Sequence, residues 1–109
     1  MNKEIFSLLK AIVERLKKEY NAERIILFGS YAYGKPKETS DLDLFIIMES
    51  DESSAKRRIK VSQLFWDREM PMDFIVQTPS EVKERLAIGD PFIKKIIEKG
   101  KLLYERKVS

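Results

Sequence analysis

Two aspartates, one residue apart, stand at the start of the most hydrophobic run of the chain. Asp41 precedes and Asp43 interrupts the sequence "LDLFIIM" of residues 42–48. A buried carboxylate is costly unless it is protonated, paired or bound to a cation. Because side chains alternate along a strand, both acids should point to one face, about 7 Å apart, where they can share one cation. Taken alone, the pattern is also typical of a turn cap followed by a solvent-facing acid.

The composition limits the chemistry that these acids can take part in. The chain of 109 residues has no cysteine and no histidine, which excludes disulfides, thiolate or imidazole zinc sites, and every mechanism that relies on either side chain. Carboxylate and hydroxyl oxygens remain, and such ligands suit a hard metal. Mg²⁺ is the common choice where phosphates complete its coordination. We therefore expect a divalent cation that binds together with a phosphate-bearing substrate.

A Gly-Ser pair and a third acid extend the pattern. Gly29 ends the run "RIILF", and with Ser30 it can offer backbone N–H groups and a hydroxyl to a phosphate. The pair alone is also typical of a plain strand-to-helix turn. Asp73 opens the run "MDFIVQ", where it is either a strand-start cap or a third oxygen ligand. Three carboxylates beside a phosphate cradle are the equipment for phosphoryl or nucleotidyl transfer, with one carboxylate taking the proton of the acceptor hydroxyl.

Hydrophobic periodicity and capping residues predict the elements that position these groups. In chain order we expect a helix over 5–20, strands over 24–28 and 42–48 joined through a loop at 35–40, a capped helix through Trp66, a strand over 72–77, helices that begin at Pro79 and Pro91, and a last edge strand over 101–105. In the helix that ends at Trp66, Ile59, Val61, Leu64 and Phe65 should face the core. This order predicts an α/β fold, a small mixed β-sheet of three to four strands flanked by helices, as one domain over 1–109.

Charge and hydropathy point to a cytoplasmic protein. No apolar run is long enough to span a bilayer, and the first ten residues lack the apolar core of a signal peptide. The net charge is only +3, although basic residues cluster at 55–60 and near the C-terminus. Such clusters are usually solvated helix faces; a nucleic acid or an acidic protein partner is the alternative. Leu86, Ile88, Phe92 and Ile93 offer an apolar surface for another chain, unless they only cover the sheet.

The stretch "GSYAYGKPKETSDLDL" resembles the signature of the DNA polymerase β-like nucleotidyltransferase superfamily, in which Gly-Ser is followed after ten residues by Asp-x-Asp. Gly29 and Ser30, then residues 31–40, then Asp41 and Asp43 meet that spacing, and Asp73 stands as the third acid. The small size and the wording "SDLDL" make the chain most similar to the minimal nucleotidyltransferases, or MNT proteins, which are often paired with HEPN-domain toxins. The resemblance covers nearly the whole chain.

This resemblance implies a role for each matching residue. Gly29 and Ser30 would hold the nucleotide's phosphates, and Asp41 and Asp43 would bind two catalytic Mg²⁺ ions. Asp73 would be the third ligand and the base that activates the acceptor hydroxyl. The implied reaction moves AMP from ATP to a tyrosine hydroxyl of a HEPN toxin, so that the protein acts as the antitoxin.

One position departs from the family pattern. Many relatives read "GSxARG", whereas this chain has Tyr33 where the arginine would stand. Tyrosine brings a ring and a hydroxyl but no charge. Lys35 or Lys37 is the candidate to supply the charge instead. The exchange leaves the metal site whole and puts turnover rate or the choice of partner in question.

Three other functions compete with protein adenylylation. A non-catalytic antitoxin would silence its toxin by occlusion, which the intact set of acids argues against and Tyr33 mildly favours. A transferase for a small hydroxylated molecule, such as an aminoglycoside, generally needs an added domain to hold the acceptor. Nucleic-acid binding through residues 55–60 lacks a recognised motif and ranks last. The sequence leaves open whether the chain forms homo- or hetero-oligomers.

Overall fold

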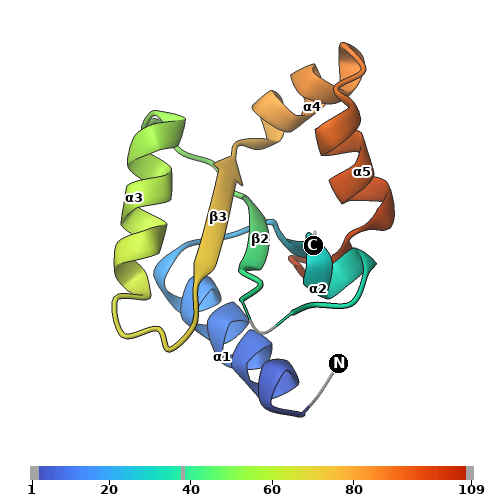
Figure 1. The fold of residues 1–109 in the computed structure, drawn as a ribbon. Coiled ribbons are helices and arrows are strands. Elements are labelled where there is room, and N and C mark those ends of the chain that lie inside the picture. The colour runs from blue at the N-terminus through green and yellow to red at the C-terminus, as the bar shows by residue number, and fades with distance from the viewer. Residues whose placement is uncertain (1–2, 38, 108–109) are drawn as a thin grey trace.

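A mixed four-stranded sheet with helices on both of its faces forms the architecture (Figure 1). The computed structural model describes residues 3–37 and 39–107. The elements are α1 (Lys3–Glu19), β1 (Arg24–Phe28), α2 (Ser30–Tyr33), β2 (Leu42–Ile47), α3 (Ser54–Leu64), β3 (Met72–Gln77), α4 (Pro79–Ala87), α5 (Pro91–Lys99) and β4 (Lys101–Glu105). The predicted fold class is confirmed, and so is the predicted order of elements except for the short helix α2, which stands where a turn was expected.

The strands lie in the order β3-β2-β1-β4. β1 pairs antiparallel with both β2 and β4, whereas β2 and β3 run parallel. The last residue of β1, Phe28, is therefore opposite Asp43 near the start of β2, and Asp43 is opposite Asp73 near the start of β3. One end of the sheet thus gathers the finish of β1 and the beginnings of β2 and β3. We call this place, with Asp41, Asp43 and Asp73, the acidic end of the sheet.

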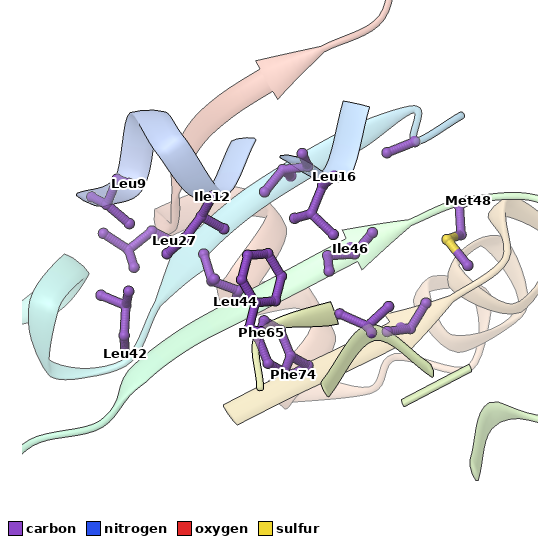
Figure 2. Packing of buried hydrophobic residues seen from close by; sticks show 14 residues of the cluster. Leu9, Ile12, Leu16, Leu27, Leu42, Leu44, Ile46, Met48, Phe65 and Phe74 are labelled. Carbon is purple, nitrogen blue, oxygen red and sulfur yellow. The ribbon is translucent and has the colours of Figure 1, made fainter. Parts of the chain in front are cut away.

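Alternation along β2 divides the core into two layers. Leu42, Leu44 and Ile46 belong to the cluster that α1 and α3 close over, of which Figure 2 shows the packing around Phe65 and Phe74. The rings of that pair stack with centroids 5.4 Å apart. The alternate residues of β2, Phe45 and Ile47, lie on the other face of the sheet and pack with side chains of α4 and α5. Each fully buried apolar side chain of this kind contributes about 1.5–3 kcal/mol.

The same alternation places two of the acids. Asp43 lies between Leu42 and Leu44, and Asp73 directly precedes Phe74, which belongs to the α1–α3 layer. Their side chains therefore fall on the opposite face, the one covered by α4 and α5. Asp43 and Asp73 are directly opposite each other in the parallel pair β2–β3. The arrangement confirms that the strand of Asp73 pairs beside the strand of Asp43.

Two predicted helix starts are confirmed by their hydrogen bonds. Thr78 and Glu81 form a capping box: the Glu81 N–H donates to Thr78 Oγ1 at 3.2 Å, and the Thr78 N–H donates to Glu81 Oε1 at 2.8 Å. Asp90 accepts from the N–H groups of Phe92 and Ile93 at the start of α5. These caps hold α4 and α5 over the face of the sheet that carries Asp43.

Two expectations for the helix α3 were wrong. The helix ends at Leu64 instead of Trp66, whose side chain is 84% exposed. Ile59 is 56% exposed, although it was expected in the core. The buried positions of the helix are Arg57 and Val61, and Phe65 follows at the same spacing. The buried face of the helix therefore runs through Arg57, Val61 and Phe65. Ile59 lies two residues from both Arg57 and Val61 and so points away from this face.

The apolar residues expected at a partner surface divide into two groups. Ile93 is buried and covers the sheet, which corrects that part of the expectation, whereas Leu86, Ile88 and Phe92 are exposed. Phe92 touches Phe28 edge to face, with ring centroids 5.8 Å apart. Within residues 3–37 and 39–107, none of the helices combines the length and apolar character that crossing a bilayer requires.

Candidate functional site

The acidic end brings together the three carboxylates that the sequence singled out. Asp43 and Asp73 are cross-strand neighbours, and Asp41 stands one residue before β2 in an exposed position. Burial raises the pKa of the Asp43 carboxyl, and the negative charges of Asp73 and Asp41 raise it further. These three charges therefore act on one another. A cation bound among them would relieve the repulsion.

Gly29 lies against this group for a steric reason. Its backbone has φ 73° and ψ −158°, a region that is essentially reserved for glycine. A Cβ atom added there would overlap Oδ2 of Asp43. The missing side chain makes room for the Asp43 carboxylate. Gly29 thus allows the end of β1 to approach the acid directly.

Ser30 begins the short helix α2 beside the acids. The Gly29 carbonyl accepts hydrogen bonds from the N–H groups of Ala32 and Tyr33, at 3.0 and 2.9 Å. No side-chain cap bonds to the first turn of α2. The Ser30 side chain is half-buried. The hydroxyl and the backbone of this turn therefore lie directly after the strand end that meets Asp43.

Among the residues that the structure describes, an arginine side chain pairs with Asp73, and no such ion pair is seen at Asp41 or Asp43. Nη2 of Arg58, on α3, donates to Asp73 Oδ1 at 2.8 Å. This pair could not be predicted from the sequence, because Arg57 and Arg58 are adjacent and chemically alike. Only the phase of α3 separates them: Arg57 is buried and binds Glu81, while Arg58 reaches Asp73.

The basic cluster at 55–60 is largely engaged in ion pairs. Besides the two arginines, Lys60 pairs with Glu52 at 2.7 Å. Paired cations are poorly suited to neutralise a nucleic-acid backbone, since each must first give up its carboxylate. The structure thus favours solvated and structural roles for this cluster.

A cation that the sequence did not suggest lies beside Tyr33. Nζ of Lys95, on α5, is 4.6 Å from the centroid of the Tyr33 ring, within the range of a cation–π contact. Burial raises the pKa of the Tyr33 phenol, and the nearby charge of Asp43 adds to it. Position 33, where the resemblance implies an arginine, therefore has a positive charge next to it that comes from a different helix. Figure 1 shows α2 next to α5.

The acids suit a hard divalent cation in kind but do not enclose one in their present conformations. Within the part of the chain that the structure describes, no three acidic side chains converge closely enough to hold a metal ion. Oxygen ligands from Asp41, Asp43 and Asp73 are the donor set that Mg²⁺ prefers. Asp73, however, is bonded to Arg58. The donor chemistry fits, and one of the three carboxylates is engaged in an ion pair.

The acidic end is recognised by its chemistry and not by a deep cavity. Three surface hollows of about 760, 450 and 760 Å³ each have residues of α1 in their lining. None of these three is lined by Asp41, Asp43 or Asp73. The carboxylates and the backbone of Gly29 therefore identify this end of the sheet as the candidate site.

Comparison with known proteins decides the family. The profile of the nucleotidyltransferase domain matches residues 9–104. The chain belongs to this family. The predicted membership of the nucleotidyltransferases, and with it the prediction of an enzyme of that class, is confirmed. Gly29, Ser30 and the three acids all lie within the matched range.

Relatives of similar length support the assignment. Two proteins of Methanocaldococcus jannaschii, assigned by name to the protein adenylyltransferases, are 32% and 31% identical over 101 and 102 residues, each covering 93% of this chain and 94% of the relative. A further relative from the same organism, with the same assignment, matches over 43 residues at 44% identity, which is 39% of this chain and 50% of that protein.

Solved structures agree on the fold. A protein from Sulfolobus solfataricus, assigned by name to the nucleotidyltransferases, superposes with a TM-score of 0.65 at 25% identity, covering 92% of this chain and 79% of that one. A toxin–antitoxin structure with AMP-PNP gives a TM-score of 0.64 at 19% identity, covering 91% of this chain and 74% of that one. At that identity the second likeness shows the fold alone.

Proposed function

We propose that this nucleotidyltransferase moves AMP from ATP to a hydroxyl of a partner protein, with Mg²⁺, and that the partner is a HEPN-type toxin whose tyrosine accepts the AMP. The protein would then be the antitoxin. The observation that carries the proposal is the gathering of Asp41, Asp43 and Asp73 at one end of the sheet, directly beside Gly29.

The comparisons support the donor and the kind of acceptor. The relatives that span nearly the whole chain are assigned by name to the protein adenylyltransferases. A solved structure of the same fold is a toxin–antitoxin with AMP-PNP, an analogue of ATP. We carry both features over to this chain as parts of the proposal.

The acids divide into two tasks. Asp41, Asp43 and Asp73 would hold the Mg²⁺ ions, which when bound neutralise the triphosphate and the leaving pyrophosphate. Asp73 would also take the proton of the acceptor hydroxyl. The acceptor oxygen then forms a bond to the α-phosphorus, the bond between that phosphorus and the bridging oxygen to the β-phosphate breaks, and pyrophosphate leaves.

The other side of the acidic end would hold the phosphates. Ser30 offers its hydroxyl there, and the turn that begins at Gly29 offers backbone N–H groups. Lys95, above the Tyr33 ring, provides the positive charge that the chain lacks at position 33 itself. A compact ammonium on a flexible stem can reach a phosphate from the neighbouring helix. We assign Lys95 to the triphosphate for this reason.

Intact-mass spectrometry of the partner tests the proposal. The neighbouring gene product is co-expressed with this protein, the complex is purified, and Mg-ATP is added. We expect the partner to gain the mass of one AMP moiety, and peptide mapping should place it on tyrosine. A partner that stays unmodified and is nevertheless silenced would support occlusion. A modified serine or lysine would contradict the tyrosine assignment.

A further inference from the structure

We propose that Arg58 is an electrostatic latch on Asp73: it holds that carboxylate in the metal-free protein and must release it before the acidic end can bind a divalent cation. The inference rests on the proposed function, because it concerns the cation site on which that function depends. It makes Arg58 a positioning residue that sets the affinity of the site for the metal.

The direct observation is the ion pair between the third acid and a residue of another layer. Arg58 Nη2 lies 2.8 Å from Asp73 Oδ1. The helix α3 packs over the face of the sheet formed by Phe74 and Val76, whereas Asp73 alternates to the opposite face. β3 is the edge strand of the sheet. The guanidinium of Arg58 therefore reaches around this open edge to the acidic end.

The neighbouring arginine shows what a structural pair looks like in this protein. Arg57 is 3% exposed and binds both oxygens of Glu81, at 2.6 and 3.0 Å, as well as the carbonyls of Glu52 and Val76. The Arg58 pair is joined through one nitrogen, and its side chains are 63% and 42% exposed. The buried Arg57–Glu81 pair is shielded from solvent on the arginine side and held by several hydrogen bonds. The exposed Arg58–Asp73 pair is open to water, which can replace either partner.

The magnitudes indicate that a cation can open the latch. An exposed ion pair of this kind shifts an equilibrium by no more than about fivefold. A divalent cation that gains a third carboxylate gains considerably more, since it also relieves the repulsion between the cross-strand neighbours Asp43 and Asp73. Arg58 and the metal cannot share Asp73 without repelling each other.

Manganese binding to the nucleotide-free protein tests the latch without any need for catalysis. Electron paramagnetic resonance counts free Mn²⁺ during a titration of wild type, Arg58→Gln and Lys56→Gln at low ionic strength. Lys56→Gln is the matched control, because Lys56 is an exposed cation on the same helix. We expect Arg58→Gln to tighten Mn²⁺ binding about three- to fivefold relative to that control.

A double-mutant cycle separates the latch from a general effect of charge. In an Asp73→Asn background, Arg58→Gln and Lys56→Gln should change Mn²⁺ affinity equally, because no carboxylate remains for Arg58 to hold. Equal effects of the two substitutions in the wild-type background would overturn the latch while leaving the metal site intact. Failure of the wild type to bind Mn²⁺ at all would overturn the proposed function together with the latch.

Discussion

Asp43 is the residue on which the rest of the site depends. It faces Asp73 across one strand pair and Phe28 across the other, its charge reaches Tyr33, and its carboxylate fills the space that Gly29 leaves. A carboxylate in such a position is destabilising by itself, since burial and two like charges raise its pKa. The cost is understandable if a cation completes the site during function.

Gly29→Ala should damage the site through two effects of one methyl group. The residue would keep a positive φ that alanine avoids, and its Cβ would push against Asp43. We expect the free energy of unfolding to fall by about 1–3 kcal/mol and transfer to be largely lost. Gly34→Ala is the control, because among the described residues none apart from its chain neighbours lies within 4 Å of a Cβ there. Chemical denaturation and a transfer assay on both variants give the comparison.

Lys95→Gln should weaken the productive use of ATP. If its ammonium contacts the triphosphate, its loss should raise KM for Mg-ATP about tenfold and change kcat less. Lys94→Gln, on the same helix, is the control. Adding Tyr33→Arg to Lys95→Gln should restore much of the affinity, since the charge returns from position 33. Equal KM values for the two lysine variants would contradict the assignment of Lys95.

At the scale of elements, α3 and α4 are joined by the buried Arg57. Its guanidinium binds Glu81, the same residue that closes the capping box at the start of α4. The hydrogen bond from Arg57 is the main reason that the pKa of Glu81 lies at about 2. One carboxylate thereby fixes a helix start and connects the two faces of the sheet.

This connection predicts a pH dependence. The pKa of Glu81 is lowered from 4.5 to about 2 on folding, so its ionised form stabilises the protein above pH 4.5 and this contribution is lost as the pH falls toward 2. Glu81→Gln should therefore cost about 1 kcal/mol at neutral pH, a value reduced for its partial exposure. Thermal unfolding of wild type and variant should differ at pH 7 and converge near pH 2.

A matched carboxylate serves as the control for this measurement. Glu84 is exposed on the same helix, so Glu84→Gln should follow the wild type at both pH values. A gap between wild type and Glu81→Gln that persists undiminished at pH 2 would contradict the role given to the Arg57–Glu81 pair.

The helices and strands could be predicted from the sequence because their start signals and apolar patterns lie within each element. Thr78 with Glu81 and Asp90 with Pro91 contain their own start signals, and the four consecutive apolar residues of β1 predict a buried strand. The phase of α3 could not be read in this way. It depends on the buried Arg57, whose partner is twenty-four positions away in the sequence, so Ile59 was placed wrongly.

The candidate site was predictable in part for the same reason. The acids could be found from their spacing, and strand pairing places Asp73 opposite Asp43 as expected. The contacts of Asp73 with Arg58 and of Tyr33 with Lys95 join different layers of the fold. Hydrophobic periodicity does not predict these contacts, because each depends on how a long side chain of one element reaches another element.

At the scale of the whole molecule, an exposed aromatic ring of α5 lies beside the strand end that leads into the site. Phe92 contacts Phe28, the last residue of β1 before Gly29, while Ile88 at the end of α4 is 68% exposed. An acceptor chain that approaches the acidic end would therefore pass close to apolar surface as well as to carboxylates. Such a neighbourhood agrees with a protein acceptor better than with a small polar molecule.

The most direct test of the account follows the label of ATP onto the co-purified partner. Wild type and Asp43→Asn are incubated with the partner and with ATP labelled at either the α- or the γ-phosphorus, and the label on the partner is measured. We predict that the α-label is transferred by wild type, with release of pyrophosphate, and is not transferred by Asp43→Asn even though that variant is at least as stable as wild type. Transfer of the γ-label, or equal transfer by the variant, would contradict nucleotidyl transfer at the acidic end.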